Sequence, residues 1–207
     1  MINRELIRIK VVQLTYAYYQ NGNRNLDVAE KELLFSLSKA YHLYHYLLAL
    51  IVAVSKEARK HYEVDTANAE RENLPLPSSK FVDKQIALQL DENKQLCDFI
   101  SSQKQTWDDD IEFVRKLYSQ IIQSNIYTEY MADEESTYET DREVWRKLYK
   151  SFVMENDEID NVLEEKSLYW NDDKEIVDTF VIKTIKRFEP GNSTEQELLP
   201  EYKDDED

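Results

Sequence analysis

Three basic residues near the start of the chain are the best candidates for chemistry: Arg4, Arg8 and Lys10. Arg4 and Arg8 are four residues apart, so a helix places them on one face. Arginine and lysine side chains bind nucleic-acid phosphates, which positions a protein on RNA without reading its sequence. The pattern therefore predicts a short RNA-binding edge, with an ordinary solvated helix start as the alternative. Lys10 lies off the Arg4–Arg8 face, so we expect it to contribute less.

Few other residues suit catalysis or metal binding. His42 and His45 are three residues apart, but zinc sites normally have three or four protein ligands, and no third ligand accompanies them. Cys97 has no neighbouring histidine, and no Gly-rich phosphate loop, CxxC pair or HExxH motif occurs. We therefore predict no catalytic residue, metal or cofactor. The competing hypothesis is a helical enzyme with a di-metal or histidine-liganded site.

Acidic runs offer a second possible source of acid–base or metal chemistry. They are Asp108–Asp110, Asp133–Glu135 and Asp172–Asp173. Each precedes or separates segments that we expect to be helical, and aspartate is a common helix cap because its side chain accepts hydrogen bonds from free backbone N–H groups. We interpret these runs as caps.

Composition limits the fold class and the location of any RNA contact. The chain has 207 residues with 2 Gly and 4 Pro, whereas average Gly usage is about 7%. Few residues suited to turns are present, so we predict an all-α fold. The formal net charge is −16, yet residues 1–62 carry a net charge of +4. An acidic surface repels nucleic acid, so we expect any RNA contact within these 62 residues.

The sequence also predicts the compartment. One cysteine excludes an internal disulfide and fits a reducing compartment. No signal peptide is expected, since charged residues follow Met1 and no cleavage site is visible. The longest apolar run, Tyr46–Val54, is shorter than the ~20 residues of a membrane span. We therefore expect a cytoplasmic protein without a membrane partner.

The expected helices begin with residues 3–20. Their apolar face is Ile7, Val11, Leu14 and Tyr18. A second helix is expected from Asp27 to about Tyr62, with an apolar stripe wide enough to be buried on two sides. The polar segment Glu63–Ser79 contains two prolines and predicts a linker.

The middle of the chain predicts shorter helices. Residues 81–90 and 96–100 are expected to be helical with a break near Asp91–Asn93, and a longer helix should run from Ile111 to about Met131. The tetrapeptide Arg-Lys-Leu-Tyr occurs at 115–118 and again 31 residues later at 146–149. This repeat predicts two similar helices in similar environments.

The segment Asp141–Glu189 predicts three helices, each with apolar residues on one face. With the second helix they should form one bundle of about seven helices. The expected shared core is Trp145, Leu148, Ile159, Leu163, Phe180 and Ile182, packed with Leu37, Tyr44, Leu47 and Ile51.

The same segment carries a family resemblance. Its ordered residues are Glu158-Ile159-Asp160, Trp170, Asp178, Ile182-Lys183 and Phe188-Glu189. This series resembles the central signature of the NusB family of transcription antitermination factors. In addition, Val11–Tyr16 resembles the second half of the family's Arg-rich first helix, and Arg4 and Arg8 fall on its arginine positions. Two departures concern surface chemistry: Lys174-Glu175 stands where an Arg is usual, and Ile182-Lys183 replaces Leu-Arg.

The resemblance implies a NusB-like helical bundle and a bacterial factor that binds boxA-type RNA. Members of the family pair with NusE, a small ribosomal protein, in the RNA polymerase antitermination complex during ribosomal RNA synthesis. The alternative hypothesis is a non-enzymatic helical protein-interaction module without RNA affinity. The sequence also leaves a homodimer open.

These patterns divide the chain into four predicted regions. They are N-terminal helices with a basic edge (1–62), a helical insertion and linker (63–140), a NusB-like helical core (141–189) and an acidic, extended or disordered tail (190–207). The family continues into a further helix that nothing here matches, so we expect a truncated chain or a diverged tail. Asp204–Asp207 resembles the acidic start of another helix.

Overall fold

The computed structural model describes residues 1–22, 25–191 and 196–202. Across these residues the fold is all-α, as predicted, with nine α-helices and no strand. The helices are α1 (Arg4–Gln20), α2 (Leu26–Glu72), α3 (Gln85–Glu92), α4 (Lys94–Ser102), α5 (Ile111–Ile122), α6 (Asn125–Ala132), α7 (Tyr138–Tyr149), α8 (Asp157–Lys166) and α9 (Lys174–Arg187). A π-helical turn (Lys150–Met154) extends α7, and a 3-10 turn (Asn171–Asp173) precedes α9.

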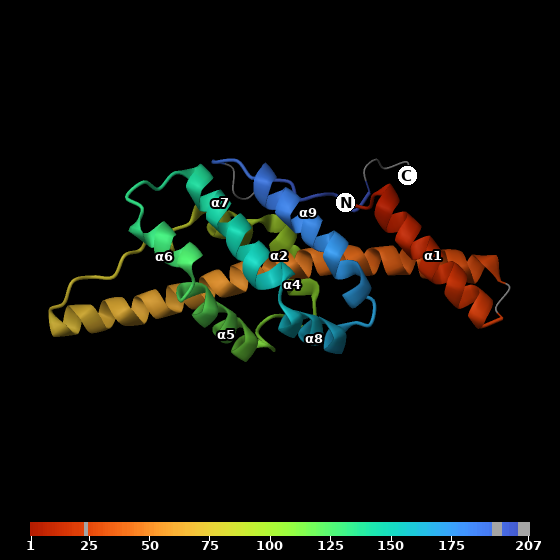
Figure 1. Ribbon diagram of the computed structural model, residues 1–207, viewed down its shortest axis with the longest axis horizontal. Coiled ribbons are helices and arrows are strands. Elements are labelled where there is room, and N and C mark those ends of the chain that lie inside the picture. Colours follow the sequence, from red (N-terminus) through yellow and green to blue (C-terminus); the bar gives the residue numbers. More distant parts are fainter. Residues whose placement is uncertain (23–24, 192–195, 203–207) are drawn as a thin grey trace.

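Helix α2 is the axis of the molecule. It spans the long dimension, with α1 against its first half and α3 to α9 around its middle, while its last turns project beyond the other helices (Figure 1). Residues 43–52 of α2 are all buried, so this stretch is enclosed on every side. The wide apolar stripe predicted for the second helix is therefore confirmed.

The predicted end of this helix near Tyr62 is wrong. Helix α2 continues to Glu72 and ends at Asn73, whose backbone is left-handed (φ 55°). Residues 63–72 contain no Gly or Pro and several strong helix formers, so nothing stops the helix before Pro75. The linker therefore begins about ten residues later than expected.

Other helix boundaries also differ from the prediction, since α3 starts at Gln85 rather than residue 81 and α4 extends from Lys94 to Ser102. The expected helix from Ile111 to Met131 is divided into α5 and α6, because Ser124 caps α6 by accepting a hydrogen bond from the Tyr127 backbone N–H (3.2 Å). Helix α7 starts at Tyr138 with Thr137 as its cap. Asp141 of this helix is buried, and its Oδ1 accepts hydrogen bonds from Tyr130 Oη (2.7 Å) and Lys84 Nζ (3.3 Å).

The predicted core is confirmed. All ten residues expected to share it are buried and belong to one cluster. The repeated tetrapeptide also occupies similar environments in α5 and α7. Leu117 and Leu148 are both buried, and each preceding arginine pairs with a glutamate three residues earlier, as Arg115–Glu112 and Arg146–Glu143.

The described part of the acidic tail packs against the bundle without forming a helix. Leu198 and Leu199 are buried, and the Leu199 backbone N–H donates to Tyr44 Oη (3.1 Å). The chain start lies beside it: the Met1 amino group donates to the Pro200 carbonyl, and the Ile2 N–H donates to the Glu201 carbonyl at 2.8 Å. Asp204–Asp207 falls outside the described residues, so its predicted helix start is untested.

By length and apolar content α2 would also pass as a membrane span. However, 72% of its most apolar 18-residue window is buried inside the protein. Burial of this kind is typical of the central helix of a helical bundle.

Candidate functional site

Helix α1 presents the predicted arginine pair to solvent. Asn3 caps the helix, with its Oδ1 accepting a hydrogen bond from the Leu6 N–H at 2.9 Å. Arg4 and Arg8 lie one turn apart and are both exposed. Neither guanidinium has an ion pair or hydrogen bond among the described residues. Both remain free to bind an anion.

Lys10, the third predicted RNA-binding residue, is not available to RNA. Its side chain is 3% exposed, and its Nζ lies 2.5 Å from Oδ1 of Asp173, which is fully buried. Burial raises the pKa of Asp173, while the ion pair with Lys10 opposes that shift. Lys10 therefore fastens α1 to the start of α9, and its assignment to the RNA site is wrong.

The orientation of α1 explains this error. Leu6 and Lys10 point into the protein, whereas Ile7 and Val11 of the predicted apolar face are about 40% exposed (39% and 43%). The buried face is thus displaced by one residue along the helix, which corresponds to a rotation of about 100°. In this orientation Leu6 is buried and Lys10 reaches Asp173.

Asp172 and Asp173 do not act as the caps we expected. Asp173 occupies the N-cap position of α9 without a side-chain capping hydrogen bond. Asp172 Oδ2 accepts a hydrogen bond from Gln13 Nε2 at 3.2 Å. Because the 3-10 turn precedes α9, both carboxylates are directed at α1 rather than at free N–H groups of α9. Two neighbouring acidic residues therefore hold the helix that carries Arg4 and Arg8.

Two further cations lie close to the start of α1, and the sequence reasoning did not assign them to the site. Lys183 and Arg187 are exposed, lie one turn apart on α9 and have no ion pair within the described structure. The pKa of the Met1 amino group is lowered by burial and then by repulsion from Lys183 and Arg187, while Glu201 opposes the shift. The i, i+4 spacing of Lys183 and Arg187 on a polar helix face is the sequence signal that could have identified this pair. With Arg4 and Arg8 they form a basic edge of four residues.

The signature residues serve mainly the core. Trp170 is buried, and its Nε1 donates to the Lys39 carbonyl at 3.1 Å. Asp178 is 1% exposed and accepts hydrogen bonds from Tyr149 Oη (2.6 Å) and Lys174 Nζ (3.0 Å). These residues position α9 against α7 and α2, so they support the basic edge indirectly.

An apolar groove runs between α1 and the first turns of α2. Its volume is about 480 Å³, and Leu14 and Tyr18 of the predicted α1 face line it together with Leu26 and Leu33 of α2. The exposed large apolar side chains concentrate around this end of the molecule, notably Val12, Tyr16, Tyr19, Leu26 and Leu34. Exposed apolar clusters of this kind mark interaction surfaces.

The histidines pack against aromatic rings. The His45 ring stacks on Phe99 with 4.7 Å between centroids, and its Nδ1 donates to the Tyr41 carbonyl at 3.0 Å. Burial lowers the pKa of His45 to about 4. In the part of the chain that the structure describes, no group of three His, Cys, Asp or Glu side chains could hold a metal ion.

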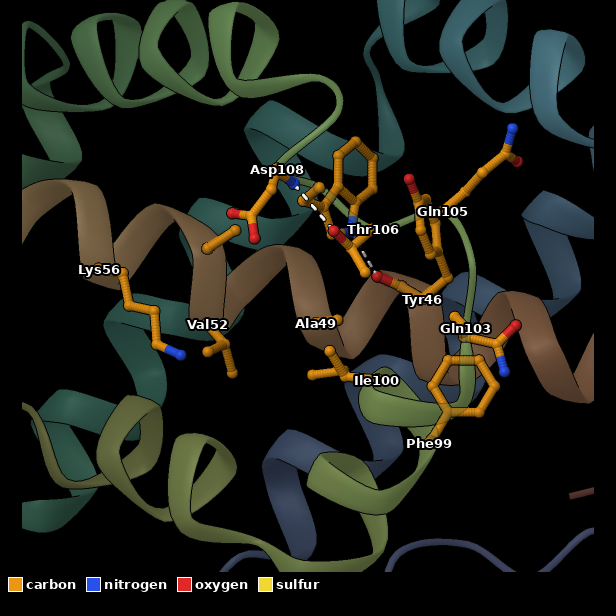
Figure 2. Close-up of a pocket in the computed structure, with 12 residues that line it drawn as sticks. Tyr46, Ala49, Val52, Lys56, Phe99, Ile100, Gln103, Gln105, Thr106 and Asp108 are labelled. Carbon is orange, nitrogen blue, oxygen red and sulfur yellow. Dashed lines mark hydrogen bonds between the residues drawn. The ribbon is translucent and has the colours of Figure 1, made fainter.

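A small cavity of about 90 Å³ lies between α2 and the segment that follows α4 (Figure 2). Tyr46 and Trp107 stack at one side of it, with 4.5 Å between ring centroids, and Phe99 and Gln103 lie at the end of α4. Trp107 is held in place because its Nε1 donates to the Tyr46 carbonyl at 2.7 Å. The cavity is too small for a typical ligand, since most ligand pockets have volumes of about 300–1,000 Å³.

Comparisons with known proteins return no match: no family model, no curated protein and no solved structure is similar to this chain.

Proposed function

We propose that this protein is a NusB-like transcription antitermination factor that binds boxA-type RNA through Arg4 and Arg8. The observation that carries the proposal is the pair of exposed guanidinium groups on α1, which have no partner among the described residues. Lys183 and Arg187 extend the positive surface at the same end of α1. The resemblance of this helix and of residues 158–189 to the family supports the same function.

In this proposal the protein acts without catalysis, in the bacterial cytoplasm, as part of the RNA polymerase antitermination complex. The protein has a formal net charge of −16. The surface outside the basic edge therefore repels RNA. Few phosphate contacts are available, so RNA binding by the isolated protein is weak. NusE tightens it by adding contacts and by holding the RNA against α1.

The test replaces both arginines, as Arg4→Glu plus Arg8→Glu. The affinity of the protein for a boxA-type RNA strand should fall. The slope of log affinity against log salt concentration should become less negative by about one for each lost phosphate contact. The melting temperature should not change, because neither side chain has a partner in the described structure. Affinity is measured by fluorescence anisotropy at several salt concentrations, with and without NusE.

The matched control is Lys31→Glu plus Lys94→Glu, which changes the net charge equally at exposed positions of α2 and α4. It should retain RNA binding. If the arginine variant keeps the parent's RNA affinity, the RNA site lies elsewhere.

A second candidate function is a helical protein-interaction module without RNA affinity. The observation that favours it is the groove of about 480 Å³ between α1 and α2, surrounded by exposed apolar side chains. The same binding experiment separates the two candidates, since absence of RNA affinity even with NusE present would favour the interaction module.

A further inference from the structure

A second, more polar pocket lies beside the cavity of Figure 2 and shares four lining residues with it: Tyr46, Phe99, Gln103 and Gln105. It has a volume of about 390 Å³ and lies between α2, the segment after α4 and the end of α8. This volume falls within the range of about 300–1,000 Å³ that is common for ligand pockets. The pocket can therefore hold a molecule that the smaller cavity cannot.

The charge of this pocket is opposite to that of the protein as a whole. Three lysines line it, and none of its described lining residues is acidic. Lys166 is neutralised, because its Nζ lies 2.6 Å from Asp110 Oδ2. Lys39 and Lys104 have no ion pair within the described residues; the Lys39 ammonium lies 5.0 Å from the Phe35 ring centroid. Two uncompensated ammonium groups at one pocket favour an anionic ligand, and lysine is a common phosphate binder.

Aromatic rings provide the other part of the pocket. Trp170 packs on Tyr46 with 5.0 Å between ring centroids, and its hydrogen bond to the Lys39 carbonyl fixes the indole next to the Lys39 backbone. His42 contacts Phe99 with 5.6 Å between centroids. Burial lowers the pKa of His42, and Lys39 adds to that shift, so the imidazole is a neutral flat ring at pH 7. Tyr46 and Trp170 are buried and pack on each other, whereas His42 and Phe99 are half-buried and offer the ring surface on which a nucleobase can stack.

From this combination we propose that the pocket binds a nucleotide, with the phosphate at Lys39 and Lys104 and the base against the half-buried rings of His42 and Phe99. The ligand is either a free nucleotide or one residue of a single-stranded RNA. The proposal goes beyond the RNA-binding function above, because none of the residues of the basic edge lines this pocket.

The experiment measures binding of AMP, ribose 5-phosphate, inorganic phosphate and a six-nucleotide RNA to the full chain by isothermal titration calorimetry. The test variant is Lys39→Gln plus Lys104→Gln. The matched control is Lys31→Gln plus Lys94→Gln, which removes the same charge from exposed positions outside the pocket on α2 and α4. Melting temperatures of both variants report whether they fold like the parent.

We expect the test variant to bind AMP at least tenfold more weakly than the parent, and the control variant to bind within twofold of the parent. AMP should bind at least fivefold more tightly than ribose 5-phosphate, because only AMP has a base to stack. If only the RNA binds and loses affinity in the test variant, the ligand is a residue of an RNA strand.

Three results would overturn the proposal. They are no binding of AMP or RNA by the parent at millimolar concentration, equal losses in the test and control variants, and equal affinity for AMP and inorganic phosphate. The variant Arg4→Glu plus Arg8→Glu should bind AMP like the parent, so failure of the RNA-binding function and failure of this proposal are distinguishable.

Discussion

The middle and the beginning of α2 both carry large apolar side chains, but in opposite environments. Residues 43–52 are buried on all sides by the surrounding helices. Near the helix start, Leu26 is 75% exposed and Leu34 is 49% exposed. The difference lies in what covers the helix, since α3, α4, α5 and α9 pack on α2 and α1 lies against its first half (Figure 1). An apolar stripe therefore predicts a surface that can be buried, and tertiary structure decides how much of it is.

The two regions are also held together differently. Apolar and aromatic packing encloses the middle of α2, as in the stacked rings of Tyr46 and Trp107. Helix α1 is fastened by Leu6 and by polar contacts, chiefly the Lys10–Asp173 ion pair and the hydrogen bond from Gln13 to Asp172. We expect the middle to respond most to loss of volume and α1 to respond most to loss of charge pairing.

The largest effect is expected from matched leucine substitutions in α2. Leu47→Ala removes a fully buried side chain and should lower the free energy of unfolding by about 2–5 kcal/mol. Leu34→Ala at the exposed end should lower it by less than about 1 kcal/mol. Urea denaturation followed by circular dichroism measures both values. Equal losses would contradict the contrast between the middle and the beginning of α2.

A somewhat smaller effect is expected at the ion pair. Asp173→Asn leaves the buried Lys10 ammonium without its partner, which should lower the free energy of unfolding by about 3 kcal/mol. Asp172→Asn, at an exposed neighbouring carboxylate, should lower it by less than about 1 kcal/mol. Hydrogen exchange of α1 amides would show whether this helix loosens first.

The double variant Lys10→Met plus Asp173→Leu tests the interpretation of the ion pair. Replacing a buried pair by apolar residues of similar size is often neutral. The double variant should therefore be more stable than Asp173→Asn alone. If the double variant is less stable than Asp173→Asn, the ion pair stabilises the fold by more than offsetting the cost of burying its own two charges.

The smallest effect is the loss of folding stability at low pH. In the folded protein the pKa of His45 is about 4, against about 6.5 in an unfolded chain. Between these values the unfolded chain binds the proton and the folded protein does not, so stability falls as the pH decreases. At pH 5 the loss should be about 2 kcal/mol relative to pH 7. His45→Gln should remove this part of the pH dependence, whereas His61→Gln, at a ring that is 54% exposed, should leave it in place.

Much of the fold could be predicted because helix periodicity and the scarcity of glycine are local signals. The buried residues of α7 to α9, such as Trp145 and Phe180, follow directly from their spacing. The extension of α2 was missed because a polar segment was interpreted as a linker although no helix breaker precedes Pro75.

The candidate site was predicted only in part. Arg4 and Arg8 were placed on an exposed face, but Lys10 was also assigned to RNA because periodicity cannot identify a partner such as Asp173, far along the chain. For the same reason the sequence could not place Lys183 and Arg187 near the start of α1. Contacts between distant segments are the information that a single sequence lacks.

The contacts of Met1 and Ile2 with Pro200 and Glu201 can form only after nearly 200 further residues have been synthesised, so they delay the final docking of α1. Helix α1 leaves the ribosome before its partners Asp172, Asp173 and Pro200 are synthesised. At about 5–20 residues per second, α1 waits roughly 10–40 s before it can dock in its final position. Throughout that interval α1 can pack only on α2, without the Lys10–Asp173 ion pair that later holds it to the start of α9.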